Sequence, residues 1–256
     1  MLKSKLLLLT VIASVTLVSC KKESLITNSV LPSPSDARVK TKTEGNNVET
    51  YYYDSQNRLS KIVFSSTNGT SYYYEYTYSN GNVYEYRSNE PRYEQEQALP
   101  NGAVKQNCTS NPGILKLNKD GFYTGAASYC QSKSYTYDSR GFITEENYSM
   151  TDYNRIDQLV YDNKNVVQII SKGYSYGGAE FSYITTFQYL TGKPTSIGNI
   201  NFGREFLGNS SEDLVKSVTE NGKTTDYLYE LDAQQRVINK TTRNNKEETV
   251  TTYTYY

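Results

Sequence analysis

The sequence predicts an all-β protein, a repeated antiparallel β-meander that forms an open or barrel-like sheet. Three observations indicate this fold: tyrosine recurs at alternate positions, a turn motif that begins with aspartate repeats along the chain, and no stretch after the N-terminal segment sustains a helical period. The alternation is clearest at Tyr72, Tyr74, Tyr76 and Tyr78, which would share one face of a strand. With 27 tyrosines against 7 phenylalanines, much of the apolar surface must come from tyrosine rings.

The turn motif has four strong copies and two weaker ones. In each strong copy a tyrosine or leucine precedes an aspartate, whose carboxylate can accept hydrogen bonds from nearby backbone amides. The fourth turn residue is Asn, Gly or Gln; Gly and Asn tolerate the positive φ that a type I turn followed by a left-handed residue requires, and Gln235 fits least well. A spacing of about 24–28 residues predicts two strands per unit and roughly a dozen strands. The strong copies span 53–59, 137–143, 161–167 and 231–237, the weaker ones 78–83 and 189–197, and the expected turn residues are Asp54, Asn57, Asp138, Gly141, Asp162, Asn165 and Asp232.

The first twenty residues are typical of an export signal. Lys3 and Lys5 precede an apolar run, Leu6–Val18, that is too short to span a bilayer and is followed by a small residue and Cys20. The last four residues of this segment, Leu-Val-Ser-Cys, resemble the bacterial lipobox, and the resemblance implies cleavage before Cys20 and attachment of lipid to it. Residues 1–19 are therefore expected to be a lipoprotein signal peptide. The alternative is an ordinary secretory signal in which the cysteine has no role.

The residues after the cysteine suggest a location and a domain plan. Lys21 and Lys22 stand where an inner-membrane retention aspartate would be found, so the lipobox resemblance favours the outer membrane of a Gram-negative bacterium, on its periplasmic or cell-surface side. Residues 20–47 contain prolines and mostly polar side chains, which predicts a flexible tether. Residues 48–256 are expected to form a single β domain, with an insertion at about 88–134 where the repeat is interrupted.

Two cysteines remain after the lipidation site, and both lie in the expected insertion. An exported protein occupies an oxidising compartment, so we expect a disulfide between Cys108 and Cys130. Two free thiols are the alternative. Without a histidine to activate a thiolate, a catalytic cysteine is not expected, and two cysteines are too few for a thiolate zinc site.

The composition excludes several classes of function. The chain has no histidine, which excludes imidazole-dependent catalysis and His-ligated zinc, and we expect no catalytic residue, metal or cofactor. With 27 basic and 27 acidic side chains and no basic stripe, no nucleic-acid partner is expected. Adjacent carboxylates such as Glu145 and Glu146 would point to opposite faces of a strand, and Glu94 with Glu96 would share a face, but no other feature marks a cleft there. An enzyme is therefore not expected.

The turn copies resemble the YD repeat of Rhs-type β-structured proteins, which has the pattern Tyr-Asp-x-x-Gly-Arg-aliphatic. Asn or Gln replaces the glycine in three of the four strong copies, and arginine follows that position only at Arg58 and Arg236. Taken with the lipobox, the length and the tyrosine-rich final strand, the chain resembles exported lipoproteins of unknown function whose YD-like repeats build a porin-like or open antiparallel sheet. The resemblance implies an architecture and does not extend to the cargo encapsulation of the much longer Rhs toxins.

Three functional hypotheses follow. The first is a membrane-anchored envelope lipoprotein that binds a glycan or a protein without catalysis, through the insertion and one sheet face; the second is a structural or assembly partner of an envelope complex. The third is a transmembrane β-barrel, suggested by the aromatic final residues Thr252–Tyr256, although tyrosine stands where a lipid-facing band needs aliphatic residues. For the first hypothesis the candidate binding residues are the insertion aromatics Tyr93, Phe122, Tyr123 and Tyr129, whose rings could stack on sugars.

Overall fold

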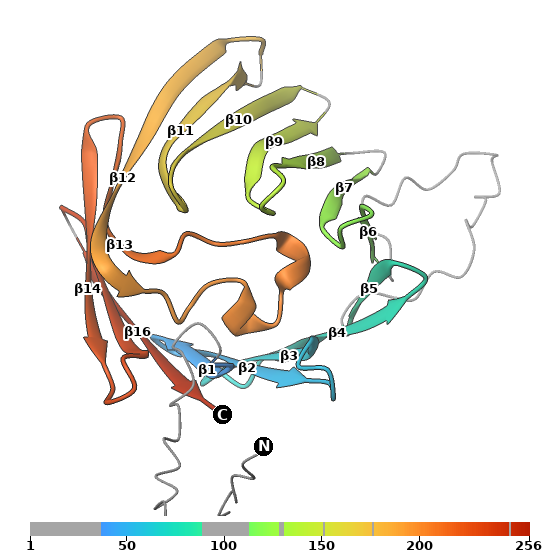
Figure 1. The fold of residues 1–256 in the computed structure, drawn as a ribbon, viewed down its shortest axis with the longest axis vertical. Helices are drawn as coiled ribbons and strands as arrows, with labels where there is room; N and C mark the ends of the chain where they lie inside the picture. Colours follow the sequence, from blue (N-terminus) through green and yellow to red (C-terminus); the bar gives the residue numbers. More distant parts are fainter. Residues whose placement is uncertain (1–36, 89–112, 128–130, 151, 176, 246) are drawn as a thin grey trace, which may run out of the picture. The chain divides into compact units, whose positions relative to one another are not determined.

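Sixteen antiparallel strands form one closed barrel in the computed structural model of the chain (Figure 1). Each strand pairs with the next one in the sequence, and β1 pairs with β16 to close the ring. The structure describes residues 37–88, 113–127, 131–150, 152–175, 177–245 and 247–256. These residues confirm the prediction of an all-β antiparallel meander and decide between the open and the closed sheet. The barrel has more strands than the dozen expected.

The strands differ widely in length, and β12 is the longest. Their bounds are β1 (Val39–Glu44), β2 (Asn47–Tyr53), β3 (Leu59–Ser66), β4 (Ser71–Ser79), β5 (Asn82–Arg87), β6 (Gly113–Leu117), β7 (Tyr123–Ala127), β8 (Gln131–Tyr137), β9 (Ile143–Met150), β10 (Tyr153–Asp162), β11 (Asn165–Tyr174), β12 (Glu180–Pro194), β13 (Asp213–Glu220), β14 (Lys223–Leu231), β15 (Val237–Arg243) and β16 (Glu248–Tyr255), with two short 3-10 helices, η2 (Ile200–Phe202) and η3 (Glu205–Leu207), between β12 and β13.

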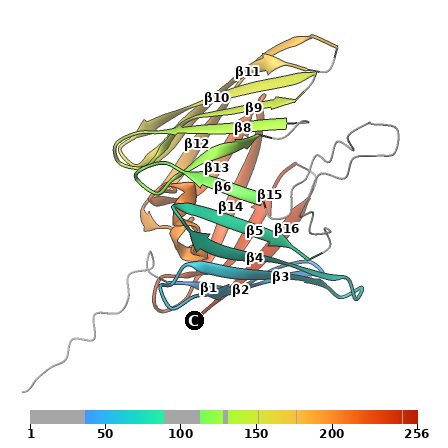
Figure 2. The same ribbon diagram turned by 90° about the vertical axis from the view of Figure 1, so that its right-hand side faces the viewer.

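The meander gives the barrel two chemically different ends. The turns that follow the even-numbered strands, from β2–β3 to β14–β15, lie at one end together with Ala37 and Tyr256, and we call this the turn end. The connections that follow the odd-numbered strands lie at the other end, which we call the mouth. Figure 2 shows how the neighbouring strands of the wall run side by side between the two ends. The repeated Asp motif falls only at the turn end, because two strands separate one copy from the next.

The aspartate turns have the geometry that the motif predicts. Asp54 Oδ1 accepts hydrogen bonds from the backbone amides of Gln56 and Arg58, both at 2.9 Å, and Asp54 Oδ2 accepts one from Arg58 Nε at 2.8 Å. Asn57 takes the left-handed conformation with φ of 60°. Burial alone would raise the pKa of the Asp54 carboxyl, but the hydrogen bonds from Arg58 and Gln56 outweigh it and lower that pKa. The turns at Asp138 and Asp232 repeat this arrangement, with Gly141 and Gln235 as the left-handed residues.

The copy at Asp162 departs from the prediction. The β10–β11 connection is a tight turn in which Asn163, at φ of 54°, is the left-handed residue instead of Asn165. Asp162 accepts a hydrogen bond from the side chain of Asn163 at 3.1 Å, and no described backbone amide binds its carboxylate. Asn165 instead accepts a hydrogen bond from the backbone amide of Asp213 at 3.0 Å. The expected role of Asp162 and Asn165 as turn residues was therefore wrong. This turn is one residue shorter than the other strong copies, which changes the position that must be left-handed.

Tyrosine hydroxyls fasten the strands together at the turn end. Tyr78 Oη donates a hydrogen bond to the carbonyl of Leu59 at 2.8 Å, so the end of β4 is tied to the start of β3. A bond of this kind typically contributes about 0.5–1.5 kcal/mol. We call these bonds the tyrosine latches, and six further ones, 2.6–2.8 Å long, run from Tyr53 to Val39, Tyr137 to Tyr123, Tyr161 to Ile143, Tyr189 to Val166, Tyr229 to Val215 and Tyr255 to Val237.

Two expected domain boundaries need correction. β1 lies within residues 20–47, which we expected to be a tether; its polar sequence shows no hydrophobic alternation, yet it pairs with both β2 and β16. The expected insertion at 88–134 contains β6 and β7, which belong to the barrel wall. Their turn uses Asn118, whose side-chain oxygen accepts two backbone amide bonds in the manner of the aspartates. The weak motif at 189–197 is not a turn of the repeat, because β12 continues to Pro194.

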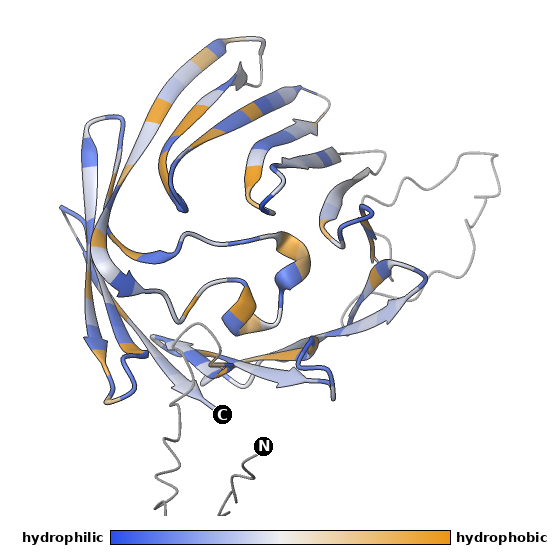
Figure 3. Cartoon of the chain, viewed as in Figure 1, coloured by the Kyte–Doolittle hydropathy of each residue, from blue (hydrophilic) through white to orange (hydrophobic). Residues whose placement is uncertain are grey.

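The core of the protein lies on the inner face of the wall. Tyr51 and Ile62 are cross-strand partners on β2 and β3, and at most 2% of either side chain is exposed. Figure 3 shows hydrophobic segments interspersed with hydrophilic ones along the strands, as expected when alternate residues face the lumen. The tyrosine face predicted from the sequence is thus largely an inner face, on which rings pack and hydroxyls find backbone partners.

The outer face of the wall carries ion pairs between neighbouring strands. Lys61 and Glu75 lie opposite each other on β3 and β4, 3.0 Å apart, and Arg243 lies 2.6 Å from Glu248 across β15 and β16. A lipid-facing surface needs a continuous apolar band, and one Arg or Lys at its middle costs about 2–4 kcal/mol. Transmembrane strands also need about 9–11 residues, whereas β6 and β7 have 5 each. The outer face also exposes aliphatic side chains, among them Ile184, Leu228 and Val250, so it combines ion pairs with apolar residues.

The described part of the chain contains no helix with the length and apolarity needed to cross a bilayer.

Candidate functional site

The lumen of the barrel is the candidate site, and one segment closes it at the turn end. Residues 195–212, between β12 and β13, fold across the inside of the ring instead of turning outside it (Figure 1). We call this segment the plug. A barrel of 16 strands is wide enough to leave an open channel, so a segment of this size can enter it. The turn motifs of the sequence gave no sign that this segment lies in the lumen.

Asn201 fixes the plug to the residues just before the first strand of the barrel. Its side chain is fully buried; Nδ2 donates to the carbonyl of Ala37 at 2.9 Å, and Oδ1 accepts the backbone amide of Gly198 at 2.9 Å. Nearby, Arg38 Nη2 lies 2.7 Å from Glu205 Oε1 and the Arg38 guanidinium also donates to the carbonyl of Ile200. These bonds satisfy polar groups that burial would otherwise leave without partners, which makes this side of the plug a specific attachment.

The plug is also bonded to the repeat turns, among them one close to Asn201 and one farther round the ring. The carbonyl of Gly203 accepts the backbone amide of Leu59 at 3.1 Å, which joins the plug to the β2–β3 turn. The backbone amide of Asn209 donates to Gly141 at 2.8 Å and its side chain donates to Arg140 at 2.6 Å, which joins it to the β8–β9 turn. The turn motif thus has a second role, because its backbone groups bind the plug as well as shaping the hairpin.

Aromatic rings line the inner face of the wall near the mouth. Tyr148, Tyr153, Phe181 and Tyr183 lie near the mouth ends of β9, β10 and β12, with successive ring centroids 5.8–6.0 Å apart. All four side chains are half-buried. We call these residues the aromatic strip. Gly173 makes room for it, because a Cβ at that position would lie 3.0 Å from the Phe181 ring.

A second aromatic group lies near the mouth on β3 and β4. Phe64 and Tyr72 stack with centroids 4.6 Å apart and planes 10° from parallel, and Tyr74 packs on Phe64 at 5.1 Å. Tyr72 remains 36% exposed. Rings that are held by their neighbours and still meet solvent can stack on the faces of a ligand. The two groups give the mouth apolar contact surfaces on separate parts of the wall.

The charged groups of the lumen are mostly paired with each other. Each pair joins a cation and a carboxylate on the inner face, and so these side chains stabilise the wall without giving the lumen a strong net charge. The carboxylates are held by cations rather than placed as an acid–base couple. The pairs are Lys42–Glu49 at 2.7 Å, Arg87–Glu85 at 3.0 Å, Lys133–Glu146 at 2.7 Å and Arg155–Asp157 at 3.1 Å.

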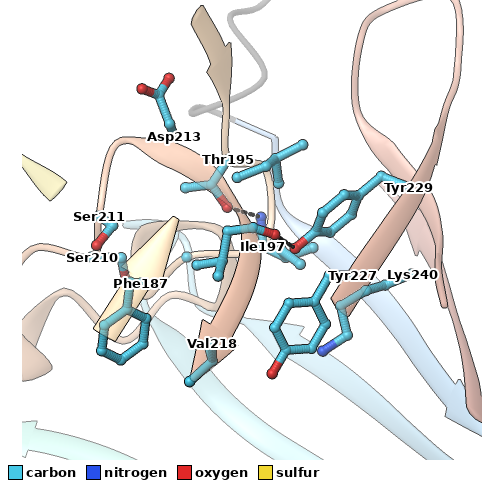
Figure 4. Close-up of a pocket in the computed structure, with 13 residues that line it drawn as sticks. Phe187, Thr195, Ile197, Ser210, Ser211, Asp213, Val218, Tyr227, Tyr229 and Lys240 are labelled. Atoms are coloured by element: carbon cyan, nitrogen blue, oxygen red, sulfur yellow. Dashed lines mark hydrogen bonds between the residues drawn. The ribbon is translucent and has the colours of Figure 1, made fainter. Parts of the chain in front are cut away.

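A cavity of about 340 Å³ lies between the plug and the wall formed by β12 to β15 (Figure 4). Phe187 and Tyr227 contribute aromatic surface, Val218 contributes aliphatic surface, and Ile197 and Ser210 come from the plug. Lys240 completes the lining from β15. The cavity combines apolar faces with a few polar groups, which is the usual composition of a small-molecule site.

Within the described residues, two polar groups of this cavity have no hydrogen-bond or ion-pair partner. Among the described residues, no carboxylate forms an ion pair with Lys240 and no hydrogen bond engages Tyr227 Oη; the Lys240 ammonium lies 5.3 Å from the centre of the Tyr227 ring. Burial lowers the pKa of Lys240, which the charge of Glu44 partly opposes. Burial also raises the pKa of Tyr227. Leaving these two groups without a hydrogen-bond or ion-pair partner costs free energy, and a polar ligand that bound them would lower this cost.

The candidate binding residues taken from the sequence do not form this site. Phe122 stacks on Tyr137 at 5.0 Å, and Tyr123 is buried with 8% exposure and packs on Tyr135. Both are parts of the wall and its turn, because the segment that carries them belongs to the repeat. The other candidates, Tyr93, Tyr129, Cys20, Cys108 and Cys130, lie outside the described residues.

Sequence reasoning missed the residues that do line the lumen. Parity along each strand could have grouped Tyr183 with Phe181 and Phe187, but it could not say which parity faces inward. In the part of the chain that the structure describes, no group of three or more Cys, Asp or Glu side chains could hold a metal ion. The site therefore offers stacking, hydrogen bonding and a cation, Lys240, that forms no ion pair with a described carboxylate.

Comparison with known structures places this architecture among porin-like barrels. A porin-like protein from Bacteroides uniformis matches with a TM-score of 0.57 and 14% identity, covering 85% of this chain and 95% of that one. A porin-like protein from Bacteroides vulgatus matches with a TM-score of 0.60 and 12% identity, covering 86% and 99%. At this level of identity the likeness shows a shared fold. No protein-family model and no curated protein matches the chain.

Proposed function

We propose that the chain is a lipid-anchored binding protein of the bacterial envelope that takes part of a glycan into its lumen through the mouth, without catalysing a reaction. The lipid anchor is Cys20, and the membrane is the outer membrane of a Gram-negative cell. The observation that carries the proposal is the aromatic strip at the mouth of a barrel whose other end holds the plug. A lumen narrowed at one end and lined with exposed rings at the other favours retention of a ligand over its passage.

The aromatic strip can act on sugars by ordinary stacking. Sugar rings present apolar C–H faces and hydroxyl edges, which suit half-exposed aromatic rings with polar groups nearby. Tyr153 and Phe181 are the central pair, with centroids 6.0 Å apart and planes 25° from parallel. Their phenol and phenyl faces come from different strands, so a bound sugar would contact a rigid surface that needs little rearrangement.

Binding can be tested by thermal denaturation of the full chain with a panel of oligosaccharides from plant, yeast and bacterial cell walls. A sugar that binds only the folded state must raise the Tm. Phe181→Ala should weaken the affinity for that sugar about fivefold, because one stacking contact is worth about 1 kcal/mol. Tyr52→Ala is the matched control, since Tyr52 is 45% exposed on the outer face.

Two results would contradict the glycan proposal. One is the absence of a Tm shift with any sugar in the panel. The other is an equal loss of affinity in Phe181→Ala and Tyr52→Ala, which would move the contact surface to the outside of the barrel. In either case an assembly role within an envelope complex would become the better interpretation.

A membrane-spanning barrel is the second candidate, and the likeness to porin-like proteins favours it. Ion pairs on the outer face, such as Lys61–Glu75, favour a barrel surrounded by water, whereas exposed aliphatic residues such as Leu228 favour a wall in lipid. A variant in which a secretory signal with its own cleavage site replaces residues 1–20 distinguishes the two. A tethered barrel should move from the membrane fraction to the soluble envelope fraction without detergent, because only the lipid holds it. A spanning barrel would stay in the membrane fraction with or without Cys20.

A further inference from the structure

Lys240 differs from four other lumen cations because it forms no ion pair with a described carboxylate. Lys42, Arg87, Lys133 and Arg155 each lie within 3.1 Å of a carboxylate oxygen. Lys240 is half-buried on β15, and Glu44, whose charge acts on it, already accepts a hydrogen bond from Thr251 at 3.0 Å. A half-buried ammonium without a counter-ion is disfavoured unless another group supplies negative charge or hydrogen-bond acceptors.

The groups around Lys240 indicate which kind of ligand could supply the missing interactions. Tyr227 turns one face toward the ammonium, and its hydroxyl has no described partner, so a donor and a cation meet in the same cavity (Figure 4). Ser210 lies on the plug side and accepts the backbone amide of Asn199 at 2.8 Å, which leaves its hydroxyl hydrogen for a ligand. Phe187 adds a second aromatic face. The cavity therefore offers positive charge, hydroxyl donors and ring faces within one small volume.

We infer that this cavity is a subsite for an acidic sugar, with Lys240 pairing with its carboxylate and Tyr227 binding the adjacent hydroxyls. This inference rests on the proposed glycan-binding function and names the class of glycan. A uronic acid supplies each complement at once: a carboxylate, hydroxyl groups and an apolar ring face. The volume of about 340 Å³ lies at the low end of the range for ligand pockets, which suits one sugar unit and excludes a folded peptide.

The test compares two ligands on the full chain by isothermal titration calorimetry. The probes are a galacturonic acid trisaccharide and the neutral galactose trisaccharide of the same linkage. The acidic probe should bind at least tenfold more tightly, and Lys240→Met should remove that preference while leaving the affinity for the neutral probe within twofold. Lys172→Met is the matched control, because Lys172 is an exposed lysine on the outer face of β11.

Each other outcome contradicts a defined statement. If both probes bind equally to the unmodified chain, the acidic subsite is wrong and the glycan-binding function stands. If Lys240→Met weakens both probes to the same extent, Lys240 supports the wall and does not select charge. If neither probe nor any sugar of the wider panel binds, the glycan-binding function fails and the subsite with it. The Tm of Lys240→Met without ligand reports whether the variant is folded.

Discussion

Raising the pH above 10 should unfold the barrel cooperatively. Burial raises the pKa of Tyr123, Tyr161 and Tyr255 from the ordinary 10.0 to about 12. Because the pKa of each buried phenol is higher in the folded state than in the unfolded state, its stabilising contribution is complete below pH 10 and is lost as the pH rises through the folded-state pKa. Burial raises the pKa values of Tyr51, Tyr53, Tyr76, Tyr78, Tyr137, Tyr229 and Tyr253 as well, so the losses accumulate.

The measurement is a parallel titration by tyrosinate absorbance and far-ultraviolet circular dichroism. Both signals should change together between pH 10 and 12, since ionising a latch tyrosine removes its proton from the bond to the neighbouring carbonyl. The same chain in concentrated guanidinium is the control, and its tyrosines should titrate near pH 10. Full ionisation of the tyrosines with the β-sheet signal intact would show that the latches are not needed for the fold.

Replacing Gly203 by alanine should detach the plug and lower the free energy of unfolding by about 2–5 kcal/mol. Gly203 has φ of +65°, and a Cβ there would lie 2.7 Å from the amide nitrogen of Leu59 and 2.8 Å from the Tyr53 ring. One part of the lost stability comes from forcing alanine into the left-handed conformation, and the other comes from the overlap of its Cβ with the backbone. The overlap also breaks the hydrogen bond from Leu59 to Gly203.

Gly222→Ala is the matched control for the Gly203 variant. Gly222 has φ of +73°, and a Cβ there meets nothing within 4 Å, so this variant carries the conformational cost of about 1–2 kcal/mol alone. Urea unfolding gives the difference between the two, and hydrogen exchange of the Leu59 amide reports whether the plug has moved. Equal destabilisation of the two variants, with the Leu59 amide still protected, would mean that the plug adapts to the added methyl.

The local parts of the fold could be predicted from the sequence because they depend on local chemistry. Asp54 binds amides two and four residues ahead, and Asn57 needs only its own left-handed conformation, so the motif carries the whole turn. Alternating tyrosines likewise predict strands. β1 could not be recognised, since Val39–Glu44 is mostly polar and becomes a strand only because β2 and β16 supply its partners.

The candidate site was less predictable because it is made of long-range contacts. Asn201 binds Ala37, which is 164 residues away, and no local pattern marks the plug. The sequence alone does not distinguish Lys240 from the other lysines, because only the closed barrel shows which alternate positions of β15 face inward. The aromatic candidates chosen from the supposed insertion were misplaced for a related reason, since Tyr123 starts a strand that the gap in the motif concealed.

The seam between β1 and β16 determines when the barrel can be completed. Every other strand pairs with its neighbour in the sequence, and hairpins of this kind form in about 1–10 μs. The seam joins groups as far apart as Glu44 and Thr251, 207 residues away, so it is the one pairing in the wall with high contact order. Until β16 pairs with them, β1 and β15 each have an unpaired edge that can form hydrogen bonds with another chain. The interval before closure is therefore the period of greatest exposure to edge-to-edge aggregation, and a factor that shields those two edges would raise the yield of folded protein.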